Sequence, residues 1–520
     1  MTAGPAYTRD DTLDDARTLW RHALGILAAS TVLRLLLGTI VPLFPDETYY
    51  WEWSRHLAGG YFDHPPMIAV LIAGGRILLG DTPLGVRLLP IIAGSVAGLA
   101  LTTAAWDLAG ARAARFAALT FSLFPMAAAG FILATPDAPL LAAVSCTLLA
   151  VVRALGAPAG SPASTRWWIG GGIAIGLAMS SKFTGVFIPA ALLLAFVVHP
   201  PLRTRLLEPG PWIAVGIASL VMLPVLLWNA EHDWIAFRFQ LGHGLGVSLK
   251  DTWVTRELKL AGGQLALATP ILFVLLVAAS ARALRAPREE RRFPLAVIAA
   301  FCAVFFAYSA TRRSVEANWP AIAWLPAIIL LAAAREGLRV AWERRALWLA
   351  GSLSAILLTH VVVPILPLPP RRDQVSQAHG WDGLAGAVDS ARHAIAAASA
   401  SGAAPFIAAN RYQDAAMLAF HLPDHADVAA LNLGGRRNQY DLWPRFAERA
   451  RPGADLLLVL ELPREGLPGP IRRLDGHFAS ITAGPFIPLL RGATEVGRRR
   501  LWVLTGWSGT WPADSTDPRR

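Results

Sequence analysis

The chain has 520 residues, of which 54% are hydrophobic and 16% are charged, and its mean hydropathy is +0.45. Soluble domains carry about 25% charged residues, so this composition excludes an ordinary soluble protein and indicates a polytopic membrane protein. The formal net charge of +11 suggests nucleic-acid binding, but the arginines form short clusters between apolar runs, and no basic groove motif accompanies them. The two cysteines lie inside apolar segments and imply neither a disulfide framework nor a metal site.

Eleven apolar segments are candidate membrane spans, because a spanning helix needs about 20 largely apolar residues. They are 22–41, 84–106, 114–134, 138–156, 167–181, 183–199, 211–229, 262–281, 293–310, 319–334 and 346–366. The run 66–80 is shorter and contains glycines, and we expect it to be re-entrant or to lie along the interface. No small-residue cleavage site follows the first span, which predicts an uncleaved anchor.

The arginines predict the orientation of these spans, since cytoplasmic loops carry an excess of positive residues. With the N-terminus in the cytoplasm, every inner turn holds arginines. These are Arg112/Arg115, Arg153/Arg166, Arg203/Arg205, Arg282/Arg285/Arg288/Arg291/Arg292 and Arg335/Arg339/Arg344/Arg345. The polar segments 42–66, 135–137, 230–261 and 311–318, together with Lys182, then fall on the outer side. This alternation predicts a multi-pass protein of the bacterial inner membrane with its polar candidates on one extracytoplasmic face.

The last part of the chain has a different character. The proline-rich segment 364–370 predicts a stiff exit from the membrane. Residues 371–520 are more polar, and their short apolar runs alternate with helical patterns. These runs are 406–409, 455–460 and 501–505. The predicted architecture is a polytopic α-helical membrane domain, residues 1–370, followed by a small extracytoplasmic α/β domain, residues 371–520.

The first outer loop, residues 42–66, combines acidic with aromatic side chains directly after a span. Asp46 and Glu47 are candidate catalytic acids, because a carboxylate there can take a proton from an attacking hydroxyl. The alternative is that they open an interfacial helix as cap and first-turn acid. Tyr49 and Tyr50 have the amphipathic rings typical of the membrane interface and are candidate substrate contacts.

Two further acids occur in turns that face the outer side. Asp63-His64 precedes two prolines, so the pair is either a helix start or a contact for a phosphate or a sugar hydroxyl. Asp137 lies in a very short turn between two spans and is either a capping residue or a second catalytic acid.

Outer-face cations suggest an anionic ligand. Lys182 is the only lysine among the first 249 residues and is either a phosphate ligand or a snorkelling side chain. Arg312 and Arg313 violate the positive-inside bias, which favours an anion outside. The remaining candidate substrate contacts are Arg55, Glu316 and Asn318.

Several functional classes lack their motifs. No Walker loop, nucleotide-binding glycine fingerprint, HExxH or CxxC is present. Transporters place polar groups near the bilayer midplane, whereas here they gather at one surface. A flippase for a polyprenyl-linked glycan and a non-catalytic membrane sensor remain the alternatives to an enzyme.

The chain resembles the polyprenyl-phosphate-sugar-dependent glycosyltransferases of the GT-C superfamily. The resemblance is closest to the bacterial family 39/83 group, related to protein O-mannosyltransferases and to the lipid A aminoarabinose transferase. The motifs are Asp46-Glu47-x-Tyr49-Tyr50-Trp51, Tyr61-Phe62-Asp63-His64-Pro65-Pro66, Arg87-Leu88-Leu89-Pro90, Thr135-Pro136-Asp137-Ala138-Pro139-Leu140, Ser181-Lys182-Phe183-Thr184-Gly185 and Glu316-Ala317-Asn318-Trp319-Pro320. In the tail, Arg411-Tyr412-Gln413 and Asn438-Gln439-Tyr440-Asp441-Leu442-Trp443 are similar to the outer domain of these enzymes.

The resemblance implies transfer of a sugar from a polyprenyl-phosphate carrier to an acceptor hydroxyl, with inversion and without a nucleotide sugar. Asp46 matches the aspartate proposed as general base, and Asp137 matches a second outer-loop acid. Asp63-His64 stands where the aminoarabinose transferase group tends to have Glu-Lys. The resemblance implies no cofactor, and a divalent metal stays open. The acceptor is a lipid, a glycan or a protein.

Overall fold

The computed structural model describes residues 9–246, 251–286, 289–334, 340–370, 372–399, 402–461 and 468–512. The chain forms two compact units. The first, the membrane unit, comprises Met1–Ile40 and Leu57–Val363, and the second, the C-terminal unit, comprises Val41–His56 and Pro364–Arg520. The segment that carries Asp46 therefore belongs to the same compact unit as the C-terminal part of the chain.

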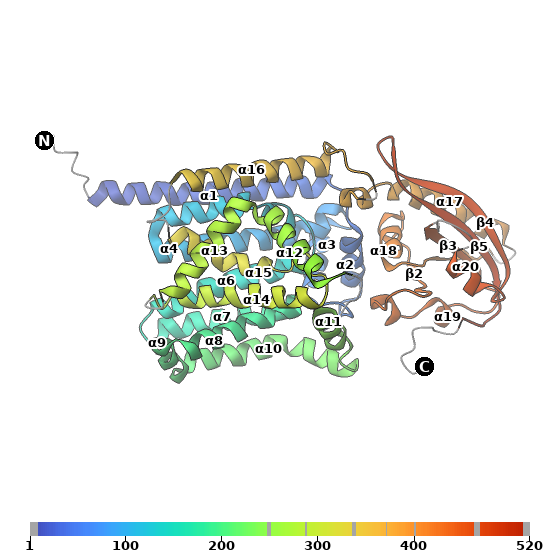
Figure 1. The fold of residues 1–520 in the computed structure, drawn as a ribbon. Helices are drawn as coiled ribbons and strands as arrows, with labels where there is room; N and C mark the ends of the chain where they lie inside the picture. Colours follow the sequence, from blue (N-terminus) through green and yellow to red (C-terminus); the bar gives the residue numbers. More distant parts are fainter. Residues whose placement is uncertain are drawn as a thin grey trace. The chain divides into compact units, whose positions relative to one another are not determined.

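All secondary-structure elements in the described part of the membrane unit are helices (Figure 1). Its helices are α1 Arg9–Ile40, α3 Met67–Leu79, α4 Pro83–Leu123, α5 Pro125–Gly130, α6 Asp137–Gly156, α7 Pro162–Ser181, α8 Phe187–Val198, α9 Pro200–Arg203, α10 Pro209–Glu231, α11 Ile235–Leu245, α12 Trp253–Ala268, α13 Pro270–Arg285, α14 Phe293–Arg312, α15 Ala321–Ala333 and α16 Val340–Val362, with 3-10 turns η1 Phe183–Val186 and η2 Thr204–Leu207.

Local sequence explains where several of these helices begin. The hydroxyls of Thr82, Ser161 and Thr252 each accept the backbone N–H three residues later, which satisfies a donor that the first turn leaves unpaired. Pro83 and Pro162 occupy the first helical position, where the missing N–H costs nothing.

Among the described residues, six helices are long and apolar enough to cross a membrane, or up to eight if each of two bent helix pairs is one span. The helices α3 and α15 are apolar but shorter. The protein is thus a multi-pass membrane protein, with fewer long helices than the eleven predicted segments. The segments 84–106 and 114–134 begin in one helix, α4, which has non-helical backbone angles at Ala109 and Gly110.

The predicted span 262–281 is wrong as a continuous helix. The structure ends α12 at Ala268 and starts α13 at Pro270, and the two helices are bent by 99°. Thr269 has a positive φ of 62°, which an α-helix does not allow, and Pro270 lacks the N–H needed to continue one. A hydropathy window does not detect this break, because threonine and proline interrupt the apolar run only briefly.

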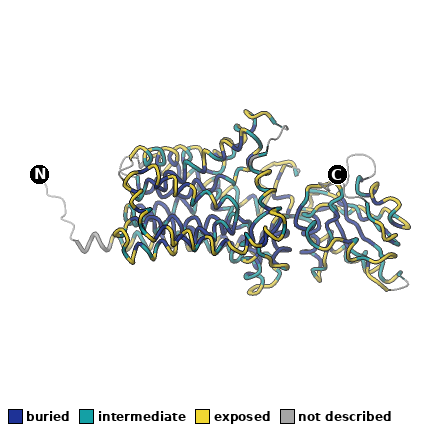
Figure 2. The backbone as a smooth tube through the Cα atoms, turned by 90° about the horizontal axis from the view of Figure 1, so that it is seen from below, coloured by how far each residue is buried: buried dark blue, intermediate teal, exposed yellow. Residues whose placement is uncertain are grey.

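The surface of the membrane unit agrees with a lipid environment. Figure 2 shows buried residues along the inner sides of its helices and exposed residues along their outer sides. The exposed residues include large apolar side chains such as Leu36 on α1, Ile77 on α3 and Trp348 on α16, which are 61%, 85% and 77% exposed. Water-soluble monomers rarely present so much apolar surface.

The C-terminal unit combines helices with one mixed sheet, which confirms the predicted small α/β region. Its elements are α2 Pro45–Arg55, η4 Gln374–Ala378, α17 Trp381–Ala398, β1 Phe406–Ala409, α18 Tyr412–His421, β2 Val428–Ala430, η5 Gln439–Asp441, α19 Phe446–Arg449, β3 Leu456–Glu461, α20 Gly469–Leu474, β4 Phe478–Arg491 and β5 Thr494–Trp507. The strand order is β2-β1-β3-β5-β4.

The central strands of this sheet are the apolar runs seen in the sequence. β1 is parallel to β2 and β3, with Ile407 opposite Val428 and Leu457. β5 is antiparallel to β3 and to β4, its long partner at the edge (Figure 1). Leu456–Leu460 are all buried, as expected of a strand covered on both faces. The sequence analysis missed β2 and β4, because the first has three residues and the second is mostly exposed.

Candidate functional site

Helix α2 carries Asp46 at its first turn, and its neighbour Glu47 makes the capping contact. The Glu47 carboxylate accepts the backbone N–H of Phe44 at 3.0 Å, and Glu47 is only 1% exposed. Pro45 fills the first helical position. Of the two acids, Glu47 thus serves the helix start, whereas Asp46 is exposed beside it.

The aromatic residues of α2 pack inside the C-terminal unit. The Tyr49 hydroxyl accepts the backbone N–H of Gln439 at 2.7 Å. Its ring centroid lies 4.4 Å from that of Tyr412 and 6.1 Å from that of Tyr440, with the Tyr440 ring stacked. Tyr50 packs edge-to-face on Trp53 at 4.9 Å. These contacts hold α2 within the C-terminal unit. Burial in this cluster raises the pKa of the Tyr440 hydroxyl well above its ordinary value.

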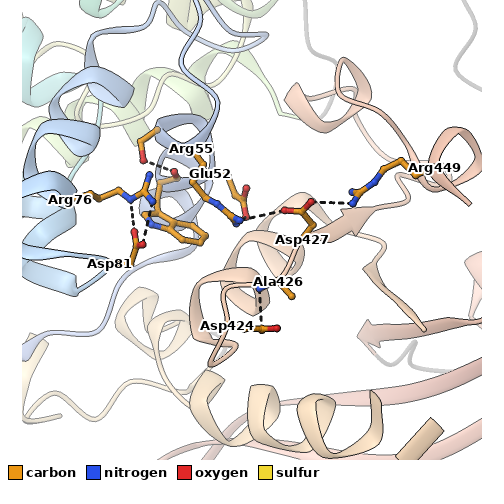
Figure 3. A network of polar contacts seen from close by, with 10 residues as sticks. Glu52, Arg55, Arg76, Asp81, Asp424, Ala426, Asp427 and Arg449 are labelled. Carbon is orange, nitrogen blue, oxygen red and sulfur yellow. Dashed lines mark hydrogen bonds and ion pairs between the residues drawn. The ribbon is translucent and has the colours of Figure 1, made fainter. Parts of the chain in front are cut away.

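A charged network joins the end of α2 to the same unit (Figure 3). Arg55 contacts Glu52 at 3.2 Å and Asp427 at 3.4 Å, and Arg449 contacts the other oxygen of Asp427 at 3.1 Å. The guanidinium of Arg55 also lies over the Trp51 ring at 4.9 Å. Arg55, predicted as a substrate contact, is therefore held by two carboxylates.

Three predicted site residues meet in the membrane unit, although they come from three distant segments. Lys182 Nζ donates to Asp137 Oδ1 at 2.8 Å, and Asn318 Nδ2 donates to Asp137 Oδ2 at 2.9 Å. The side chains of Lys182 and Asp137 are 12% and 16% exposed. Asp137 starts α6, Lys182 follows α7, and Asn318 precedes α15. The Asp137 carboxylate thus orients one cation and one amide.

The Asp63-His64 turn is tied to helix α11. The Asp63 carbonyl accepts the Gln240 side-chain amide at 2.5 Å, and Asp63 is 5% exposed. The His64 carbonyl accepts the Tyr61 N–H at 3.1 Å. Burial raises the pKa of the Tyr61 hydroxyl, which accepts the N–H of Ala58. The turn is thus built by backbone contacts, and Gln240 is a residue that the sequence analysis missed.

The two arginines after α14 differ in their contacts. Arg313 Nη1 donates to the Gly242 carbonyl at 2.8 Å, which links this turn to α11. Arg312 Nη1 lies 3.5 Å from the Tyr308 hydroxyl one turn earlier in its own helix. Glu316 is exposed, and its carbonyl accepts the Trp319 N–H at 3.1 Å. Among the described residues, no three His, Cys, Asp or Glu side chains gather as a metal site.

Comparisons with known proteins agree on one superfamily. The dolichyl-phosphate-mannose-protein mannosyltransferase family matches residues 63–228. A lipid A galacturonosyltransferase from Rhizobium johnstonii is 27% identical over 317 residues, which are 60% of this chain and 64% of that protein. The match therefore spans less than two thirds of this relative's own length. These matches make the chain similar to glycosyltransferases of the GT-C superfamily.

Solved structures show the same fold. The apo structure of ArnT from Cupriavidus metallidurans has a TM-score of 0.61 at 19% identity, with 94% of this chain and 98% of that chain covered. The structure of the same protein bound to undecaprenyl phosphate has a TM-score of 0.58 at 17% identity and covers 92% and 97%. The similarity in fold thus extends over nearly the whole chain, which confirms the predicted fold class.

Proposed function

We propose that this GT-C protein transfers a sugar from a polyprenyl-phosphate carrier to an acceptor hydroxyl, with inversion at the anomeric carbon. The observation that carries the proposal is the start of α2, where Glu47 makes the capping contact and Asp46 is exposed beside it. Support for the donor comes from the undecaprenyl phosphate bound to ArnT. The lipid A named for the Rhizobium relative makes a lipid A-type glycolipid our preferred acceptor.

In the proposed reaction Asp46 acts as general base. It takes the proton of the acceptor hydroxyl while that oxygen forms a bond to the anomeric carbon. The bond from this carbon to the phosphate oxygen breaks, and its electron pair stays on the departing polyprenyl phosphate. Because negative charge grows on the phosphate, nearby cations stabilise the transition state. We assign this role to Lys182, Arg312 and Arg313.

The other candidates receive supporting roles in this proposal. Asp137 holds Lys182 and Asn318 in place, as their 2.8 and 2.9 Å hydrogen bonds indicate. Asp63 and His64 contact sugar hydroxyls or the phosphate. We place the membrane unit in the inner membrane, with a cytoplasmic N-terminus, and residues 371–520 on the extracytoplasmic side. Of the inner arginines that support this orientation, Arg288, Arg335 and Arg339 lie outside the described residues.

The decisive test replaces Asp46 and Glu47 separately. Asp46→Asn keeps the shape but removes the proton acceptor, so turnover should fall by roughly 10²–10⁴-fold, as expected for general-base catalysis. Glu47→Gln should mainly weaken the start of α2. Asp475→Asn, an exposed aspartate in the same unit, serves as the matched control.

Transfer is measured with purified full-length protein, a synthetic undecaprenyl-phosphate sugar and lipid A, with mass-spectrometric detection of the product. If Asp46→Asn turned over as fast as the wild type, Asp46 would not be the general base and would only be an acid in the first turn of α2. Absence of transfer from any polyprenyl-phosphate sugar by the wild type would favour a flippase or a sensor instead.

A further inference from the structure

The parallel part of the sheet in the C-terminal unit brings arginines to one edge. β1 ends at Ala409, and its two parallel partners, β2 and β3, end at Ala430 and Glu461. Because the carboxyl ends of parallel strands meet at one edge, the loops after β1 and β2 lie together there, as ligand-binding loops do in open α/β sheets. These loops and the nearby helix α20 supply Arg411, Arg436, Arg437 and Arg473, which we call the arginine edge.

Contacts of Arg411, Arg436 and Arg473 place these three side chains around the two loops. Arg436 Nη2 donates to the Tyr412 hydroxyl at 3.1 Å, and its guanidinium lies 5.4 Å from the centre of that ring. Arg411 contacts Glu461 at 2.9 Å, with both side chains about half exposed. A Cβ at Gly434 would lie 3.3 Å from the Arg473 guanidinium, so Arg473 reaches the loop after β2 from α20.

The loop after β2 is held in a defined shape. The Leu433 N–H donates to the Asn410 side chain at 2.9 Å, which ties it to the loop after β1. Asn432, at a positive φ of 46°, donates to Asp441 at 2.8 Å. Gly434 has a φ of 89°, a conformation that favours glycine, and a Cβ there would lie only 3.3 Å from the Arg473 guanidinium.

The arginine edge adjoins the helix that begins with the proposed base. Tyr412, which Arg436 contacts, packs on Tyr49 of α2 with ring centroids 4.4 Å apart. Tyr49 is three residues after Asp46, or about one helical turn. All of these residues belong to the C-terminal unit. A molecule bound at this edge therefore lies close to the helix that presents Asp46.

We propose that the arginine edge binds the phosphate groups of the lipid acceptor's head group. Guanidinium groups form paired hydrogen bonds with phosphate oxygens, and several exposed arginines around one loop offer such pairs. The inference rests on the proposed function, which already gives the donor's phosphate its own cations, Lys182, Arg312 and Arg313. The arginine edge is then the acceptor's anchor on the unit that carries the base.

The test measures binding without transfer. Full-length protein in detergent is titrated with lipid A, with the same lipid A after phosphatase treatment, and with undecaprenyl phosphate. The variants are Arg436→Gln/Arg437→Gln and Arg411→Gln, and Arg436→Lys keeps the charge but loses the paired donors. Arg498→Gln, which removes an exposed arginine paired with Glu495 on β5, is the matched control. Gel filtration and thermal unfolding check that each variant is folded.

Loss of a charge-assisted contact should weaken lipid A binding about tenfold or more in the Arg436/Arg437 variant. Arg436→Lys should lie between this variant and the wild type, and Arg498→Gln should bind as the wild type does. Phosphatase-treated lipid A should bind weakly to all of them, and affinity for undecaprenyl phosphate should not change.

Unchanged lipid A affinity in the folded variants, or an equal loss for the phosphatase-treated lipid, would overturn the proposal. A loss confined to undecaprenyl phosphate would overturn it too, because the edge would then serve the donor. The result is separable from the proposed function. Wild-type protein that transfers no sugar but binds lipid A through these arginines would refute transfer and leave the binding site standing.

Discussion

Replacing Lys182 by methionine tests whether its ion pair with Asp137 stabilises the fold, in addition to the proposed role of Lys182 in binding the donor's phosphate. The two side chains are 12% and 16% exposed and their charged atoms are 2.8 Å apart. Exposed pairs contribute about 0–1 kcal/mol, whereas removing one partner of a buried pair costs about 3–5 kcal/mol. The burial of this pair lies between these limits, so Lys182→Met should lower the free energy of unfolding by about 2 kcal/mol. The Asp137 carboxylate would keep its hydrogen bond from Asn318 but lose the ammonium group.

The double variant Lys182→Met/Asp137→Asn separates this pair from other effects. The double variant should lose about 1 kcal/mol less free energy of unfolding, or even less, than the sum of the losses in the two single variants. Lys259→Met is the matched control, since Lys259 is also 2.8 Å from an aspartate, Asp251, but is 58% exposed. Its loss should stay below about 1 kcal/mol.

The assay is unfolding of the full-length protein by titration of mixed detergent micelles with sodium dodecyl sulfate, followed by tryptophan fluorescence. Additive losses in the double variant would refute the coupling of Lys182 and Asp137. Titration of the same variants with undecaprenyl phosphate gives a separate readout. An affinity loss of tenfold or more with Lys182→Met is expected for a charge-assisted phosphate contact, and unchanged affinity would leave the residue a structural role alone.

Three further predictions concern other parts of the chain. Tyr49→Phe should lower the free energy of unfolding by about 1–3 kcal/mol, because the buried Gln439 N–H loses its acceptor. Tyr50→Phe is the control, and equal midpoints of thermal unfolding for the two variants would contradict the expectation. A reporter active only outside the inner membrane, fused after Arg520, should be active, and activity of a cytoplasmic reporter there instead would reverse the proposed topology. Dialysis against EDTA should leave turnover unchanged, and recovery of lost activity with Mg²⁺ or Mn²⁺ would establish a metal requirement.

The sequence alone was sufficient for the class of protein and for much of its local structure. Long apolar runs predicted α6, α10 and α14, and three short apolar runs predicted β1, β3 and β5. These signals are local, because burial of a whole helix or strand leaves a continuous or periodic record of apolar residues. The motifs in the first loop and near Asp137 likewise led to the GT-C resemblance, which the comparisons confirm.

Only the tertiary structure decided which polar groups meet. Asp137, Lys182 and Asn318 are far apart in the chain, and no local pattern predicts that one carboxylate holds the other two. The choice of Glu47 rather than Asp46 as the residue that caps α2, and the packing of that helix with the C-terminal unit, also required coordinates. The physical reason is that apolar periodicity specifies which face of an element is buried, whereas partners across elements depend on how those faces pack, and many packings bury the same faces equally well.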